Sequence, residues 1–422
     1  MTAAQQHTRV WLNGSVYSPA DPFATALLVT GSTLAWVGSD DAARSVAGPQ
    51  VTPGDLRAAV VTPAFVAHHR VAGASRDAGA LPRTEQGYGA VELLGADAEA
   101  LAAVAEQVVA DGAHALPVLV RAVTGEAEIA TSELPSPALG FDAAAHTDSA
   151  ALRDAARHHL VACTRKGIQA VLVLPERPAG VHYSNSGSPT TGGGSTFGVA
   201  PTTETGSAGV GSPLTADTPG GGAAASSSGL APNAVTNALL EAAQGARDEV
   251  GERAFRARGH RLVGVGPLDD EQCERLAELN LTVSCRAGAA PLRELSRAGV
   301  PVTLMTDASN PWSAVKDALE APEERLRTSA RAAFLALTRG AWRAHPGGSA
   351  LAGQLVPGAE ATLAVWDAES VMVQQAQGTG ASWSTDPRAR TPVLPALDDA
   401  RLPRCEATLV AGELVAGTEP RP

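Results

Sequence analysis

The chain has 422 residues, of which 44% are hydrophobic and only 4% are aromatic. This length favours two or three structural units, and the hydrophobic content excludes a wholly disordered chain. Lysine and arginine number 32 against 44 aspartate and glutamate residues, which gives a net charge of −12. An acidic surface repels phosphate backbones, so the composition argues against a nucleic-acid partner.

Signals for export or membrane insertion are missing from the sequence. The first nine residues are polar, and no stretch of 18 apolar residues occurs. Four scattered cysteines, at positions 163, 273, 285 and 405, form no C-x-x-C pair. Because such cysteines are typical of a reducing compartment, we expect a cytoplasmic protein without a membrane partner.

Short β-strands are predicted near both ends of the chain. At the start, apolar runs alternate with turn signals such as Asn13-Gly14, and the predicted strands cover 10–12, 26–30, 34–37 and 58–62. At the end, the predicted strands cover 361–366, 371–374 and 407–410. We expect the two ends to pair into one small β-sandwich.

The middle of the chain alternates helical and strand patterns, which predicts parallel βα units. The predicted helices cover 96–110, 149–165, 238–258, 270–279, 291–298, 313–319 and 329–342. About six strands are recognisable, and clear ones cover 116–120, 168–174, 260–265, 281–285 and 300–305. The predicted fold class is therefore α/β: an incomplete (β/α) TIM-like barrel together with the small β-sandwich.

Residues 180–230 consist mainly of Gly, Ser, Thr, Pro and Ala, with two charged residues. Large apolar side chains are too sparse there to offset chain entropy, so we expect a disordered loop. A glycine-rich phosphate site is the alternative, but the P-loop pattern and any lysine are absent.

Three segments resemble a known family. The opening Val10-Trp11-Leu12-Asn13-Gly14, the run Val61-Thr62-Pro63-Ala64-Phe65-Val66 and the run Thr303-Leu304-Met305-Thr306-Asp307 are similar to the metal-dependent amidohydrolases of the family-3 type. The resemblance covers roughly residues 9–75 and 255–415. It implies a composite β-sandwich from 1–62 and 351–422 and a barrel from 63–350, with the loop 180–230 inside the barrel.

The resemblance also implies a reaction class. Such proteins hydrolyse non-peptide C–N bonds in small molecules with a divalent metal, often zinc, at the carboxyl ends of the barrel strands. An Asp on the last strand moves the proton. Metal ligands normally include a His-x-His pair, a Lys carbamate or Glu, and two further histidines.

Few of these residues carry over. His69 matches the first ligand, but Val71 stands at the second, and Gly264 stands where a later histidine is expected. Lys166 and Lys316 do not lie where a carbamate would form. We therefore interpret the metal site as degenerate, with His69 and Asp307 as its remaining candidates.

Asp307 is the catalytic candidate, because it ends an apolar strand where the family places its proton shuttle. The alternative for Asp307 is an N-cap or Asx turn before Pro311. His69 is either a remnant of the site or a solvated histidine. We interpret His68 and His260 as structural, and the remaining histidines, at 7, 114, 146, 158, 159, 182 and 345, as surface residues.

Two functions remain open at this point. One is a C–N hydrolase with an eroded metal site, and the other is a catalytically inactive relative that binds or regulates. Both take a small-molecule ligand, and both are compatible with a homo-oligomer.

Overall fold

The computed structural model describes residues 8–71, 81–175, 182–183, 189–190, 230–368, 371–377, 380–384, 392–397 and 401–422. Most of the predicted loop 180–230 lies outside the described residues. Within it, only Leu230 and the paired strands β12 (His182–Tyr183) and β13 (Pro189–Thr190) are described.

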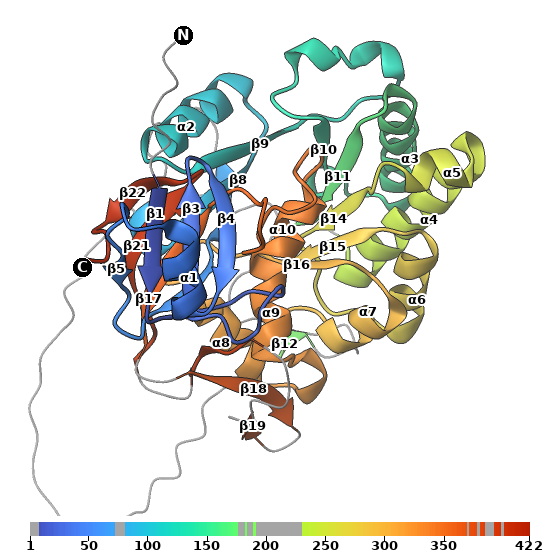
Figure 1. The fold of residues 1–422 in the computed structure, drawn as a ribbon. Coiled ribbons are helices and arrows are strands. Elements are labelled where there is room, and N and C mark those ends of the chain that lie inside the picture. Colours follow the sequence, from blue (N-terminus) through green and yellow to red (C-terminus); the bar gives the residue numbers. More distant parts are fainter. Residues whose placement is uncertain are drawn as a thin grey trace, which may run out of the picture.

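Eight parallel strands form the central sheet, and their spatial order follows the sequence (Figure 1). They are β7 (Phe65–Val71), β8 (Tyr88–Gly95), β9 (His114–Val120), β10 (Ala138–Asp142), β11 (Gln169–Val173), β14 (Arg261–Val263), β15 (Thr282–Cys285) and β16 (Val302–Leu304). One backbone hydrogen bond, from His68 N–H to the Thr306 carbonyl at 2.8 Å, links β7 to the segment after β16. The curled sheet is consistent with the predicted incomplete TIM-like barrel, although the predicted number of strands was too low.

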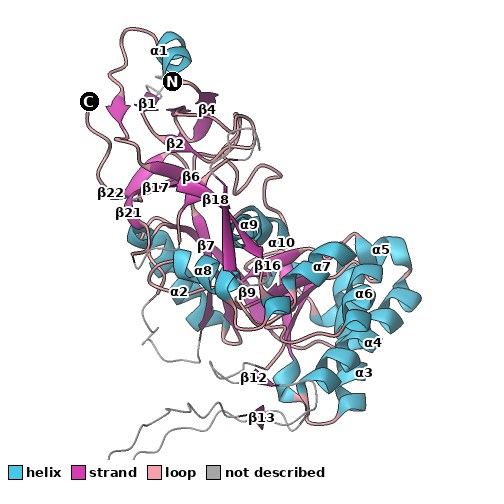
Figure 2. Ribbon diagram, turned by 90° about the horizontal axis from the view of Figure 1, so that it is seen from below, coloured by secondary structure: helices cyan, strands magenta, loops and turns pink. Residues whose placement is uncertain are grey.

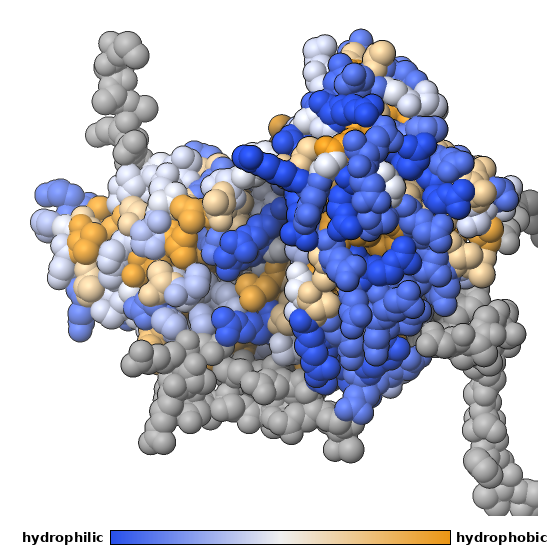
Figure 3. All heavy atoms as spheres, turned by 90° about the vertical axis from the view of Figure 1, so that its right-hand side faces the viewer, coloured by the Kyte–Doolittle hydropathy of each residue, from blue (hydrophilic) through white to orange (hydrophobic). Residues whose placement is uncertain are grey.

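Helices cover the outside of this sheet at most of its crossovers (Figure 2). They are α2 (Ala98–Ala110), α3 (Ser149–Lys166), α4 (Pro232–Val250), α5 (Glu252–Arg256), α6 (Asp270–Glu278), α7 (Leu292–Ala298) and α8 (Trp312–Glu320). Between β9 and β10 the chain forms only the short 3-10 helices η2 (Glu126–Glu128) and η3 (Thr131–Glu133). The helical layer is thus incomplete at this crossover. On the face shown in Figure 3, the exposed surface is mostly hydrophilic.

A predicted single helix over 329–342 is two helices in the structure, α9 (Ala330–Leu337) and α10 (Arg339–Ala344). The break falls at Thr338, whose backbone is not helical and whose hydroxyl donates to the Phe334 carbonyl at 2.8 Å. Gln169, the first residue of β11, donates to the Ala344 carbonyl at 2.9 Å. The end of α10 therefore lies at the amino end of the barrel.

Two small sheets are built from the chain ends (Figure 1), the first from the amino-terminal segment alone and the second from both ends. The first contains β4 (Thr33–Gly38), β3 (Ala26–Thr30), β1 (Thr8–Leu12) and β5 (Gly54–Asp55), in that order, and α1 (Asp40–Ala47) packs on it. The second contains β2 (Ser15–Val16), β6 (Val60–Pro63), β17 (Leu363–Asp367), β21 (Arg404–Val410) and β22 (Glu413–Gly417). Side chains from both sheets, among them Trp11, Leu27, Leu363 and Leu409, share one apolar cluster.

A third sheet lies near the barrel helices. It consists of β19 (Gly380–Ser384), β18 (Val371–Gln377) and β20 (Leu394–Pro395). Among the helices of the described residues, none is both long and apolar enough to span a bilayer.

Aromatic rings join the barrel to the sheet that contains β6 and β17. Phe65, the first residue of β7, contacts the rings of Trp312, Phe334 and Trp366 at centroid distances of 5.1, 5.4 and 5.7 Å. All four side chains are buried. Trp366 on β17 also donates its indole N–H to the Thr62 hydroxyl at 2.9 Å. Residues more than 300 positions apart are thereby held in one core.

Candidate active site

The inward face of β7 differs from the one that the sequence predicts. A register shift between Phe65 and Val66 sets His68 opposite Glu92 on β8. Leu94, two residues after Glu92, packs with Val118 and Val263 of other strands in the barrel interior. Because side chains alternate along a strand, His68 and Arg70 share the inward face, whereas His69 and Val71 do not.

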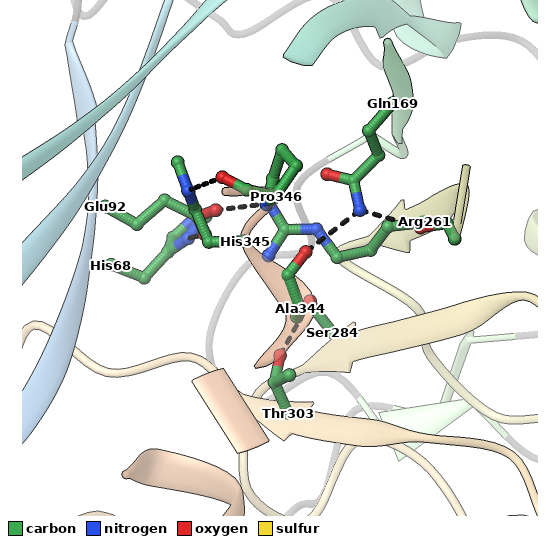
Figure 4. A network of polar contacts seen from close by, with 10 residues as sticks. His68, Glu92, Gln169, Arg261, Ser284, Thr303, Ala344, His345 and Pro346 are labelled. Atoms are coloured by element: carbon green, nitrogen blue, oxygen red, sulfur yellow. Dashed lines mark hydrogen bonds and ion pairs between the residues drawn. The ribbon is translucent and has the colours of Figure 1, made fainter. Parts of the chain in front are cut away.

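A buried ion cluster occupies the barrel interior (Figure 4). The Glu92 carboxylate accepts from His68 Nδ1 at 2.9 Å and from Arg261 Nη2 on β14. The side chains of these three residues are 9% exposed or less. Burial alone would raise the pKa of Glu92, but the Arg261 charge and the His68 hydrogen bond lower it well below its usual range.

We call Glu92, His68 and Arg261 the Glu92 cluster. More polar groups surround it. His345 lies beside it, and its Nδ1–H donates to the Pro346 carbonyl at 3.2 Å. Burial lowers the pKa of His345, and the Glu92 charge raises it in part. Thr303 donates to the Ser284 hydroxyl at 2.7 Å. A cavity of about 10 Å³ beside His68 and Arg261 leaves room for about one water molecule.

Arg70 reaches across the carboxyl end of the barrel. Its Nη2 donates to the carbonyl of Leu174, directly after β11, at 3.2 Å. The sheet order separates β7 from β11 by three strands, so the guanidinium spans the opening. The Arg70 side chain thereby lies at the end of the barrel where active sites of such folds occur.

Asp307 lies three residues after the end of β16, at the carboxyl end of the barrel. Its Oδ1 lies 3.3 Å from Arg286 Nη1, and the two side chains are 46% and 55% exposed. The turn here is held by other residues: the Thr306 hydroxyl accepts from Ala308 N–H, and Asn310 Oδ1 accepts from Trp312 N–H. The cap or Asx role that the sequence offers for Asp307 is filled by its neighbours.

His69 lies near Asp307 but is not hydrogen-bonded to it. Burial lowers the pKa of His69, and the Asp307 charge raises it in part. Tyr88 is also close, because its hydroxyl donates to the Ala308 carbonyl at 2.7 Å. The structure thus brings together the two predicted site residues, with Arg286 and Tyr88 beside them.

The described residues do not fit a divalent metal. No group of three or more His, Cys, Asp or Glu side chains that could hold an ion occurs among them. Glu92 and His68 are already bonded within the Glu92 cluster, so their ligand atoms are engaged. Gly264 follows β14 with a positive φ of 84° and offers no ligand.

Some histidine predictions were wrong. His159 and His345, expected at the surface, are buried. His260 is structural as expected: its Nδ1 accepts from Ala170 N–H and its Nε2 lies 2.9 Å from the Thr164 hydroxyl.

Sequence reasoning also missed Glu92 and Arg261. Each is a charged residue in a short apolar strand, and a buried charge requires a partner.

Comparisons with known proteins agree with this fold. Residues 230–416 match the model of the amidohydrolase family. No curated protein matches the chain by sequence. Among solved structures, a triazine hydrolase variant shares 15% identity at a TM-score of 0.56, covering 99% of this chain and 96% of its own.

Two further structures extend the comparison. A mutant of atrazine chlorohydrolase TrzN from Arthrobacter aurescens TC1, complexed with zinc and atraton, shares 15% identity at a TM-score of 0.58, covering 98% of this chain and 96% of its own. An amidohydrolase shares 11% identity at a TM-score of 0.54, covering 98% of this chain and 100% of its own. Residues 230–416 are thus similar to the amidohydrolase family, and the chain shares its overall fold with these hydrolase structures.

Proposed function

We propose that this protein hydrolyses a non-peptide C–N bond of a small molecule at the carboxyl end of the barrel, with Asp307 as its proton shuttle. The observation that carries the proposal is the placement of Asp307 three residues after the last strand, half-exposed, beside Arg286 and His69. Active sites of such barrels lie at this end. The structural neighbours named triazine hydrolase and atrazine chlorohydrolase support a small-molecule substrate.

The reaction would use residues of this chain. Asp307 accepts a proton from water while the water oxygen attacks the carbonyl or imine carbon. The C–N bond then breaks, and Asp307 returns the proton to the leaving nitrogen. The Arg286 guanidinium is placed to balance negative charge that develops on the substrate oxygen or nitrogen. Because the described side chains do not fit a metal, no step is assigned to one.

The test is the substitution Asp307→Asn, which keeps the shape of the side chain and removes its ability to accept a proton. We expect turnover of an amide, lactam or carbamate substrate to fall by at least about 10²-fold. The matched control is Asp367→Asn, because Asp367 also ends a strand, is 55% exposed and lies 3.3 Å from an arginine, Arg404. If Asp307→Asn and Asp367→Asn turn over the substrate equally fast, the Asp307 carboxylate is not the proton shuttle.

The second candidate function is a catalytically inactive binding or regulatory protein. It is favoured by the placement of Arg70 across the opening and by the ion-paired Glu92 cluster within. The same substrate panel distinguishes the two candidates. Absence of turnover by the wild-type protein, with and without added zinc or manganese, favours binding. In that case Asp307→Asn should change stability by less than about 1 kcal/mol, the usual contribution of an exposed ion pair.

A further inference from the structure

A second cavity lies at the opposite end of the barrel from Asp307. It measures about 290 Å³ and lies between α7, α9, α10 and the start of β16. Val302, the first residue of β16, lines it. A Cβ atom on Gly340 would lie 3.1 Å from the Val302 carbonyl oxygen, so glycine allows α10 to approach β16 closely. The cavity is therefore at the amino end of β16, whereas Asp307 follows its carboxyl end.

The lining of this cavity combines two positive charges with an apolar wall. Arg339 and Arg343 line it together with Leu292 and Leu335, and no acidic residue is among the described residues that form it. Ser296 and Thr328 add hydroxyl groups. One part of the wall thus matches an anion, and the other part matches a hydrocarbon body.

Among the residues that the structure describes, neither arginine has a partner for its charge. In the part of the chain that the structure describes, the guanidinium groups of Arg339 and Arg343 make no hydrogen bond or ion pair, and Nε of Arg339 is buried without one. Burial and the neighbouring charge of Arg343 both lower the pKa of Arg339. Two like charges beside one cavity repel each other, and an anion between them would relieve this repulsion.

We propose that this cavity, lined by Arg339 and Arg343, is a binding site for a small organic carboxylate with an apolar body. A guanidinium presents paired N–H donors that match the two oxygens of a carboxylate. The apolar side chains of Leu292, Val302 and Leu335 would cover the hydrocarbon part of the ligand. The site is separate from the proposed catalytic end and does not depend on hydrolysis.

Isothermal titration of the full-length protein with benzoate tests this assignment. Benzamide, which has the same ring without the charge, is the ligand control, and inorganic phosphate tests for an anion without an apolar body. We expect benzoate to bind at millimolar concentration or below, and the other two to bind at least about tenfold more weakly, since a charge-assisted hydrogen bond contributes about 1.5–3 kcal/mol. Equal binding of benzoate and benzamide, or tighter binding of phosphate, would overturn the proposal.

Variants locate the binding. Arg339→Met should weaken benzoate binding at least about tenfold. Arg343→Gln changes an exposed position, so it should fold even if Arg339→Met does not, and it should also weaken benzoate binding measurably. Ala332→Leu should block the cavity while keeping both charges. Arg297→Gln on α7 removes a nearby exposed charge that does not line the cavity and should leave binding unchanged, as should Asp307→Asn. Undiminished binding in Arg343→Gln and Ala332→Leu would place benzoate elsewhere and refute the assignment.

Discussion

At the residue scale, the barrel interior depends on charges that have no access to bulk water. Glu92 carries a carboxylate inside the sheet, and His68 and Arg261 are its partners. Glu92 stands alone among apolar neighbours in its strand, so the sequence does indicate a buried charge there. It does not indicate which cation pairs with it, because Arg261 is 169 positions away.

Removal of one partner should therefore destabilise the fold strongly. Arg261→Met leaves the Glu92 carboxylate buried without its cation, and we expect a loss of about 3–5 kcal/mol in the free energy of unfolding. Urea unfolding followed by circular dichroism measures this loss. The control is Arg404→Met, whose arginine is 65% exposed in its ion pair with Asp367 and which should lose less than about 1 kcal/mol. Similar losses in the two variants would contradict the described role of the Glu92 cluster.

At the element scale, the sequence predicts most helices and several strands, because their periodicity is strong. It misses β8 and β10, whose apolar runs contain glycine and, in β8, the charged Glu92. The family resemblance also assigns His69 as the first ligand. In the structure the alternation along β7 instead sets His68 and Arg70 on the interior face, where His68 lies opposite Glu92.

The contact between α3, β11 and β14 should make stability depend on pH through His260. Burial, together with the charges of His159 and Arg258, lowers the pKa of His260 to about 3. Its Nδ1 accepts a hydrogen bond from Ala170 N–H. Protonation of Nδ1 would place a second hydrogen against the Ala170 N–H and break this hydrogen bond. The neutral form is favoured in the folded state. Its contribution is complete above the unfolded pKa of about 6.5 and is lost as the pH falls toward 3.

Unfolding free energies of wild type and His260→Gln between pH 7 and pH 3 check this expectation. Glutamine can accept and donate at the same places without titrating, so its stability curve should be flatter than that of the wild type. The exposed His158→Gln serves as the control and should follow the wild-type curve. Parallel curves for wild type and His260→Gln would show that His260 does not titrate on unfolding.

At the scale of the whole molecule, segments from both ends of the chain complete one structure. Strand β17 lies between β6 and β21, so residues before and after the barrel form the same sheet. The alternation of β-rich ends and a βα middle predicts this arrangement from sequence. The identity of the contacting residues could not be predicted, because the aromatic cluster of Phe65, Trp312 and Trp366 gathers side chains from distant segments.

The joint between sandwich and barrel should depend on Trp366. Trp366→Ala removes a buried ring that contacts Phe65 and Trp312 and also removes a hydrogen bond to Thr62. We expect a loss of about 3–5 kcal/mol in the free energy of unfolding, measured by chemical denaturation. Phe23→Ala, at a side chain that is 55% exposed, is the control and should change stability little. A small effect of Trp366→Ala would show that the two parts are held together by other contacts.

The central claim is that this chain keeps a barrel of the kind found in amidohydrolases, while its described side chains do not form a site for a divalent metal. Catalytic zinc sites usually need three protein ligands, whereas the candidates here are His69 and Asp307, with Arg70 across the opening. Elemental analysis of the protein purified without a chelator tests this claim most directly. We predict well under one tightly bound divalent ion per chain, and stoichiometric zinc would contradict the account.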